Sequence, residues 1–228
     1  MVLVYHGVAE VEPRDDPHRL ATAPRRLRAH LRLLRRLGYR LAAAEELLDA
    51  PASLPPPPGT AVLTFDDGWR DALEAVAPVL GELDARGSFY VCPGWWGGRH
   101  PELGGTAGAL LGEAEVAELA RLGLEIGSHS MSHRDLRALD DAALEADLRD
   151  SKEAIEATTG RRCRTFAYPF GLHNERVAAA VENAGYELAL SWGPGPWRPF
   201  AVPRLPAPPR GGAATLALKL AGLRRRRR

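Results

Sequence analysis

Two adjacent carboxylates and two closely spaced histidines are the residues in this sequence whose types and spacing suit chemistry. Asp66 and Asp67 directly follow the apolar run 62–65, and His129 and His133 stand four residues apart further along the chain. Two negative charges held side by side repel each other, which is tolerable when a cation neutralises one and the other handles protons. Two imidazoles at this spacing can reach one ion. With Asp67 they predict a divalent metal site of the His₂Asp type, whose open coordination position is typical of catalysis.

Each of these features also has an ordinary structural explanation. The Asp-Asp-Gly stretch can be a buried strand that ends in a turn, because Asp-Gly is a common turn dipeptide. A pair of histidines four residues apart is a weak indication of a metal when it stands alone, whether it lies on a helical turn or in a tight loop. Because both features occur in one chain, we favour the metal site.

The segments that carry these residues are short apolar runs that alternate with helical patterns. Strands are expected at 2–5, 62–65, 88–92 and 124–129, within 164–171, and at 186–191. Helices are expected at 24–37, 43–50, 69–86, 113–122, 141–158, 175–184 and 213–223. Residues 9–23 are expected to form a loop, 55–59 a stiff proline spacer within the domain, and 194–209 an irregular segment.

Strands that alternate with helices of this length predict an α/β fold with a parallel sheet. The polar residues that could do chemistry share one position, the carboxyl end of a predicted strand: His6, Asp66, Asp67, His129 and Tyr168. A (β/α) barrel brings such ends together on one face. A doubly wound open sheet would do the same less completely.

Length and composition fit one globular domain. The chain has 228 residues, 45% hydrophobic and 26% charged, with a formal net charge of +1. No overall field therefore favours nucleic acid as a partner. The basic run 224–228 is expected to be a solvated tail, with a nucleic-acid or membrane contact as the alternative. Cys92 and Cys163 are expected to be buried thiols, because two cysteines make no disulfide framework.

The start of the chain carries no recognisable targeting signal. Its apolar run is interrupted by Tyr5 and His6 before it reaches the length of a signal peptide. No stretch approaches the ~20 apolar residues that a transmembrane helix needs. The chain as written is therefore expected to be cytoplasmic, while peripheral membrane association, export, the true start codon and the oligomeric state stay open.

Three motifs, in this order, resemble those of the polysaccharide deacetylases, the NodB-homology proteins of carbohydrate esterase family 4. They are Thr-Phe-Asp-Asp-Gly at 64–68, His-Ser-Met-Ser-His at 129–133 and Phe-Ala-Tyr-Pro-Phe-Gly at 166–171. The opening Val-Tyr-His-Gly-Val resembles the branch that contains poly-N-acetylglucosamine deacetylases. The likeness covers roughly residues 60–190. It implies an irregular, incomplete (β/α) barrel of seven or eight parallel strands, formed by a single domain, 1–228, with its motif-bearing core at about 60–205.

The resemblance also implies roles for individual residues. Asp67, His129 and His133 would hold a divalent metal, expected to be Zn²⁺, and Asp66 would be the general base. This agrees with the argument from the residues, because a carboxylate that binds the cation leaves its neighbour free to accept a proton. The backbone N–H of Tyr168 would stabilise the oxyanion of the tetrahedral intermediate. A buried aromatic without a function is the alternative for Tyr168.

Two places depart from the family pattern. Many relatives have an arginine that orients the base where this chain has Ala167, and Arg204 is the candidate substitute, an ordinary surface arginine being the alternative. The late Leu-x-His motif that supplies the general acid in many relatives is absent, because no histidine follows His173. The acid is then expected to be His6 or His173, and His6 is favoured because strand ends converge.

Other histidines and the tryptophans carry weaker expectations. Three histidines without a comparable context are expected on the surface: His18, His30 and His100. Four tryptophans in predicted loops and strand ends are candidates for stacking on sugar rings, with core packing as the alternative: Trp95, Trp96, Trp192 and Trp197.

The leading hypothesis is a metal-dependent hydrolase that removes acetyl groups from an N-acetylated glycan or sugar intermediate. The alternative is a catalytically impaired glycan-binding protein on the same fold, favoured by Ala167 and the missing late histidine and opposed by the intact Asp66, Asp67 and histidine pair. A phosphoesterase is a weaker hypothesis, because two-metal sites need more carboxylates. The identity of the glycan, and the choice between N- and O-acetyl groups, stay open.

Overall fold

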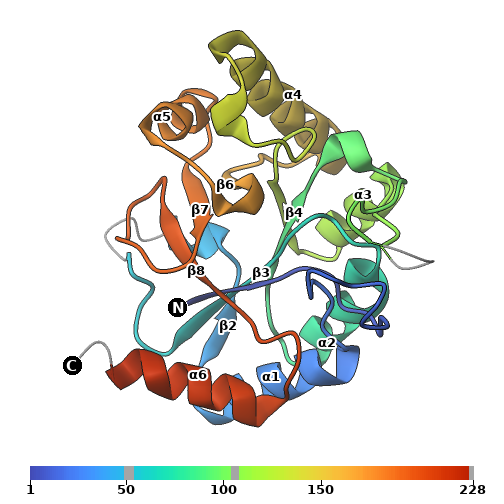
Figure 1. Ribbon diagram of the computed structural model, residues 1–228, viewed down its shortest axis with the longest axis vertical. Coiled ribbons are helices and arrows are strands. Elements are labelled where there is room, and N and C mark those ends of the chain that lie inside the picture. The colour runs from blue at the N-terminus through green and yellow to red at the C-terminus, as the bar shows by residue number, and fades with distance from the viewer. Residues whose placement is uncertain (49–53, 104–107, 226–228) are drawn as a thin grey trace.

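The computed structural model describes residues 1–48, 54–103 and 108–225, and its strands lie at the centre with helices around them (Figure 1). Within these residues one sheet contains eight strands, and every pairing between them is parallel. The strands are β1 (Val2–Tyr5), β2 (Arg40–Ala42), β3 (Thr60–Phe65), β4 (Ser88–Val91), β5 (Glu125–Ser128), β6 (Thr165–Ala167), β7 (Leu188–Trp192) and β8 (Val202–Pro206).

Seven of these strands close into a barrel. The order β1-β8-β7-β6-β5-β4-β3 returns to its start because β3 also pairs with β1, with Val2 opposite Val62 and Tyr5 opposite Phe65. The short strand β2 pairs with the first half of β3, on the edge that β4 occupies in the second half. The parallel (β/α) barrel expected from the sequence is confirmed.

Helices pack around the outside of the barrel. They are α1 (Pro24–Arg36), a π-helical segment (Ala72–Val76) that continues into α2 (Ala77–Glu82), α3 (Glu113–Arg121), α4 (Asp141–Thr159), α5 (Glu175–Asn183) and α6 (Ala213–Arg225). Pro24 begins α1, and Gly160, with a φ of 65°, ends α4, as their preferences for helix starts and left-handed caps predict. Among the helices of the described ranges, none combines the length and the apolar character needed to cross a membrane.

The alternation of side chains along each strand divides the core into two layers. Leu3 and Leu63 face outward and pack in one cluster with Leu27 and Leu31 of α1. Val2 and Val62, one residue earlier in each strand, belong to a second cluster inside the barrel, together with residues of four other strands: Tyr90, Ala167, Leu190 and Val202. Positions two or four residues further along a strand share the inward face. This rule directs Asp66 and Arg204 into the barrel.

Three segments differ from the sequence-based expectation. The stretch 194–209 was expected to be irregular, but it contains β8, which lies between β7 and β1. Two prolines in five residues usually argue against a strand. The helix expected at 43–50 is only a 3₁₀ turn, Glu45–Leu47, that follows β2, and residues 49–50 lie outside the described ranges. The helix expected at 69–86 is confined to 72–82.

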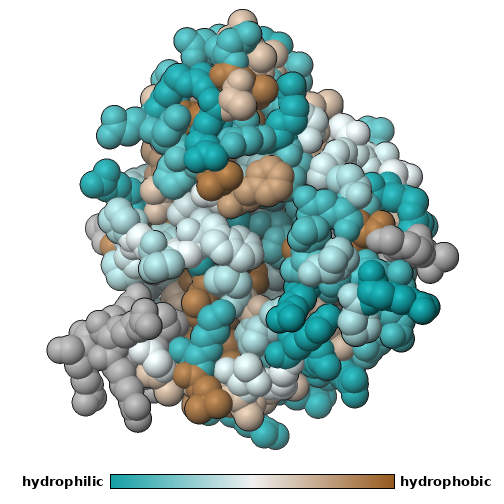
Figure 2. All heavy atoms as spheres, viewed as in Figure 1, coloured by the Kyte–Doolittle hydropathy of each residue, from teal (hydrophilic) through white to brown (hydrophobic). Residues whose placement is uncertain are grey.

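The remaining expectations concern the basic run at the end of the sequence, the surface and the two cysteines. Of the basic run 224–228, residues 224 and 225 continue α6, and 226–228 lie outside the described ranges. Hydrophilic residues cover most of the face seen in Figure 2, and hydrophobic residues form small separate patches there. Cys92 and Cys163 are buried free thiols, as expected.

Candidate active site

The turn after β3 brings two neighbouring aspartates to the same place. Asp66 continues the alternation of β3 and points into the barrel, whereas Asp67 has a φ of 71° and Gly68 a φ of 72°. Aspartate adopts this left-handed conformation more readily than most residues, and glycine adopts it freely. The chain therefore leaves its extended geometry between the two carboxylates. Both side chains are buried, with each residue only 3% exposed.

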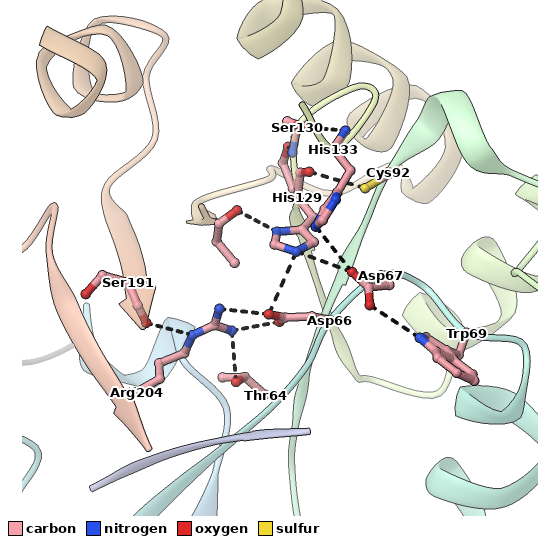
Figure 3. Close-up of polar contacts among 12 residues, drawn as sticks. Thr64, Asp66, Asp67, Trp69, Cys92, His129, Ser130, His133, Ser191 and Arg204 are labelled. Atoms are coloured by element: carbon pink, nitrogen blue, oxygen red, sulfur yellow. Dashed lines mark hydrogen bonds and ion pairs between the residues drawn. The ribbon is translucent and has the colours of Figure 1, made fainter. Parts of the chain in front are cut away.

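Asp66 forms a buried bidentate ion pair with Arg204 inside the barrel (Figure 3). Arg204 Nη1 and Nη2 each lie 2.7 Å from one Asp66 oxygen, and Arg204 is 1% exposed. Two other guanidinium N–H groups donate to Thr64 Oγ1 at 3.2 Å and to the Ser191 carbonyl at 3.1 Å. Burial by itself raises the pKa of Asp66, but Arg204 and the nearby His129 outweigh it, so the pKa lies below its ordinary value. Asp66 is therefore held as a carboxylate.

Asp67, His129 and His133 converge on one point that suits a metal ion. One ligand atom from each lies within 4.8 Å of the others. Asp67 Oδ1 is 3.5 Å from His129 Nε2 and 3.6 Å from His133 Nε2. Burial lowers the pKa of His133 to about 4, so this imidazole is neutral at pH 7. His129 Nδ1 lies 2.6 Å from the Ala167 carbonyl, which can only accept, so Nδ1 carries a proton and Nε2, which faces Asp67, is the nitrogen left to bind a metal.

A tight loop after β5, rather than a helical turn, places the two histidines. Ser130 and His133 have φ values of 67° and 54°, and the His133 N–H donates to Ser130 Oγ at 2.9 Å. Asp147 of α4 supports this loop from behind, because its Oδ1 accepts the Met131 N–H at 2.8 Å. The spacing of four residues therefore reflects a folded loop, which was one of the two arrangements that the sequence allowed.

The convergent groups line a small pocket of about 70 Å³ at the carboxyl ends of the strands. His6 also lies in its wall, and its ring centroid is 5.7 Å from that of Trp192. His173 does not line this pocket. Its ring stacks on that of Tyr168, with 4.6 Å between the ring centroids, and it borders a different surface pocket. Of the two candidates for the general acid, the structure thus brings His6 to the aspartates.

The backbone amide of Tyr168 does not fit the role expected for it. Its N–H donates to the Leu190 carbonyl at 3.0 Å, as part of the pairing between β6 and β7. Its hydroxyl donates to the Phe200 carbonyl at 3.0 Å. The prediction that this N–H stabilises an oxyanion is wrong, because the sheet already supplies its acceptor. Phe170 lines the pocket with a φ of 58°, and no acceptor for its N–H occurs among the described residues.

Two histidines that were expected on the surface are buried. His30 is 0% exposed, with Nε2 3.2 Å from the Gly211 carbonyl. His100 is 4% exposed, with Nε2 3.2 Å from Asp67 Oδ2. Only His18 is exposed as expected. Nothing local to His100 signals its place, because its contact is 33 residues away in the sequence.

The four tryptophans divide into different environments. Trp192 is 43% exposed at the wall of the pocket, beside Phe170, which is 50% exposed. Trp95 packs against the rings of His100 and His133. Trp96 and Trp197 pack against the hydrophobic clusters. Sugar stacking stays a prediction for Trp192 and Trp95, whereas Trp96 and Trp197 show the core packing that was its alternative.

Comparison with known proteins finds deacetylases, in agreement with the motifs of the sequence. Residues 53–189 match the family model described as polysaccharide deacetylase. The chain is 25% identical over 195 residues to YxkH of Bacillus subtilis, covering 85% of this chain and 64% of that protein. It is 30% identical over 132 residues to the peptidoglycan-N-acetylglucosamine deacetylase of Bacillus cereus, covering 57% of this chain and 55% of that protein. The chain thus spans less than two thirds of the length of either relative.

Solved structures share the fold. The deacetylase PplD of Streptococcus pyogenes, in complex with acetate, superposes with a TM-score of 0.82 at 22% identity, covering 95% of this chain and 96% of that one. IcaB from Ammonifex degensii superposes with a TM-score of 0.75 at 24% identity, covering 91% of each chain.

Proposed function

Because this chain belongs to the polysaccharide deacetylase family, we propose that it removes the acetyl group from an N-acetylated sugar of a glycan, releasing acetate and a free amine. We propose further that it requires a divalent metal, Zn²⁺ being the first choice. The name of the Bacillus cereus relative, a peptidoglycan-N-acetylglucosamine deacetylase, supports an N-acetylhexosamine as the substrate.

The donor set supports the metal requirement. Asp67, His129 and His133 offer one carboxylate and two imidazoles, the ligand types that zinc takes in open, catalytic sites. A divalent cation bound there would lower the pKa of a water molecule and polarise the acetyl carbonyl. The chain's own side chains must supply the proton transfers and the orientation.

The ion pair of Asp66 with Arg204 is the observation that carries the proposal. Asp66 Oδ2 lies 3.8 Å from His129 Nε2, so this carboxylate stands directly beside the proposed metal ligands. Arg204 keeps it ionised and fixes its orientation, which prepares it to take a proton from the attacking water. Arg204 also supplies the guanidinium that Ala167 lacks. One of the two arguments for a damaged, purely glycan-binding site therefore loses its weight.

Two further groups of the pocket are assigned roles in the proposed reaction. The N–H of Phe170 replaces that of Tyr168 as the backbone donor to the developing oxyanion, because Phe170 lines the pocket and this N–H has no acceptor in the described chain. His6, in the same wall, would donate a proton to the leaving nitrogen.

Acetate release from a hexamer of N-acetylglucosamine tests the proposed function. We expect release by the purified protein, loss of release after dialysis against a chelator, and recovery when Zn²⁺ is added back. Acetylated xylan serves as the matched O-acetyl substrate and separates amide from ester hydrolysis. A metal-loaded, folded protein that releases acetate from neither substrate would exclude the deacetylase activity.

A further inference from the structure

We infer that His100 positions Asp67, by holding one oxygen of its carboxylate so that the other faces His129 and His133. This inference rests on the metal site of the proposed function, and it concerns a residue that the family motifs of this chain do not include. The observations that support it are the contacts of the two Asp67 oxygens, the second hydrogen bond of the imidazole, and the way the His100 segment is attached.

The two oxygens of Asp67 have different partners. Oδ1 is the oxygen nearest His129 Nε2 and His133 Nε2, at 3.5 and 3.6 Å. Oδ2 is 3.2 Å from His100 Nε2 and 3.4 Å from Trp69 Nε1, an indole nitrogen that can only donate. Two ring nitrogens therefore hold Oδ2. A carboxylate held at one oxygen presents the other in a fixed direction.

A second hydrogen bond sets the tautomer of His100. The backbone N–H of Glu102 donates to His100 Nδ1 at 3.2 Å. A nitrogen that accepts a hydrogen bond carries no proton, so the proton of the neutral ring must be on Nε2. Nε2–H is therefore directed at Asp67 Oδ2. The arrangement is a relay from Glu102 N–H to His100 and from His100 to Asp67.

The chain fixes His100 and Asp67 relative to each other through the backbone. The stretches 97–100 and 108–111 run antiparallel, with Gly97 N–H donating to the Leu111 carbonyl and His100 N–H to the Gly108 carbonyl. The second of these stretches is also joined to the turn after Asp67, because the Leu111 N–H donates to the Gly68 carbonyl at 2.8 Å. The Arg70 N–H donates to the Ala109 carbonyl at 2.9 Å. His100 is thus anchored to the turn that carries Asp67.

Aromatic rings enclose the imidazole. The ring of Trp69 lies 5.4 Å from that of His100, and Trp95 meets it edge-on at 5.5 Å. With 4% exposure, His100 has little water to compete for its hydrogen bonds. Burial of a histidine in this way is costly unless both nitrogens are satisfied, and here each of them has a partner.

The test compares two amide substitutions that differ in reach. In His100→Gln the side-chain amide occupies the position of Nε2 and can still donate to Asp67, whereas in His100→Asn it occupies the position of Nδ1 and cannot reach. Zn²⁺ affinity is measured by competition with a chromogenic chelator, without any glycan. We expect His100→Asn to weaken Zn²⁺ binding by about 10- to 100-fold, as for other groups that orient metal ligands. We expect His100→Gln to stay within about threefold of the wild type, because its hydrogen bond is retained.

The exposed His18 provides the matched control, and His18→Asn should leave Zn²⁺ affinity unchanged. A second readout needs no metal: two-bond ¹H–¹⁵N correlation spectra of the metal-free wild type at pH 8 should show His100 as the Nε2–H tautomer. Equal Zn²⁺ affinities of the Gln and Asn variants, or an Nδ1–H tautomer, would overturn the inference. A wild type that binds no Zn²⁺ would overturn it together with the metal site. Zn²⁺ binding without acetate release would overturn only the proposed function.

Discussion

The barrel holds a buried carboxyl group at each of its ends, and the two groups have different partners: one pairs with a cation and the other with neutral donors. At the carboxyl ends of the strands, Asp66 is 3% exposed and paired with the guanidinium of Arg204. At the amino ends, Glu125 of β5 is 5% exposed, and the donors that reach it from the described residues are all neutral: Ser88, Thr165 and the Glu45 N–H. Both groups are deeply buried, so burial alone does not distinguish them.

The pKa values of the two groups move in opposite directions. Burial raises the pKa in both cases. Near Glu125 the Glu45 carboxylate raises it further, and the neutral donors bring it only to about 7. Near Asp66 the guanidinium reverses the effect, and the pKa falls below its ordinary value. A buried cation thus separates a carboxylate that is ready to accept a proton from a carboxyl group that serves the interior packing of the barrel.

The largest expected effect is on catalysis, from the same acid-to-amide change at the two ends. Asp66→Asn removes the proposed base while keeping its shape, and it should lower kcat for acetate release by about 10³-fold, within the range typical of general bases. Glu125→Gln changes the other end and should leave kcat within about threefold, because it touches no reacting group. Steady-state acetate release by the two variants checks this contrast. Equal losses of activity would show that the two ends do not differ in function.

A smaller loss of kcat is expected when Arg204 is replaced by a residue that keeps the positive charge but cannot form the bidentate ion pair. Arg204→Lys retains a positive charge, but an ammonium cannot donate to both Asp66 oxygens. We expect kcat to fall by about 10- to 100-fold with little change in KM, because the variant disturbs the base and not the contacts to the sugar. Initial rates over a range of oligomer concentrations separate the two constants.

The matched control for this change is Arg164→Lys. Arg164 also grips a carboxylate with two nitrogens, at 3.0 and 2.7 Å from Glu187, but it lies in a partly exposed pair away from the pocket. Its substitution should leave kcat unchanged, and an equal loss in both lysine variants would argue against a special role for the buried pair.

The third expected effect is on stability and its dependence on pH, and it leaves activity unchanged. The pKa of Glu125 is raised from 4.5 to about 7 in the folded protein, so its proton is bound more tightly there than in the unfolded chain. The stability contributed by this proton is fully present below about pH 4.5 and is lost as the pH rises through about 7. Glu125→Gln mimics the protonated group, and its advantage over the wild type should grow across this window, reaching on the order of 3 kcal/mol above pH 8.

Urea unfolding of the metal-free proteins at pH 5 and pH 8 measures this difference. The wild type serves as the reference at each pH, so that the titration of other groups cancels. A constant difference between the two proteins at both pH values would mean that Glu125 is already ionised in the folded state, like Asp66.

Much of the fold and of the proposed metal site was predictable from local patterns. The strand that ends in Asp66 and Asp67 is visible in its apolar run, and the alternation of strands and helices indicates a parallel sheet. His129 and His133 are close in sequence, and the three spaced motifs are specific to the family. Such features depend on neighbours along the chain, so a sequence displays them directly.

The partners of these residues were decided by the tertiary structure. Arg204 contacts Asp66 from 138 residues further along the sequence, and it lies on a strand whose two prolines make it hard to predict. His100 contacts Asp67 from the stretch 97–100, and no local pattern in the sequence predicts that this stretch lies beside Asp67. The Tyr168 N–H was assigned to the wrong acceptor because the pairing of β6 with β7 is set by register and not by local pattern. Closing the barrel fixes which strand ends meet, and that long-range register determines which cation, imidazole or amide stands beside each carboxylate.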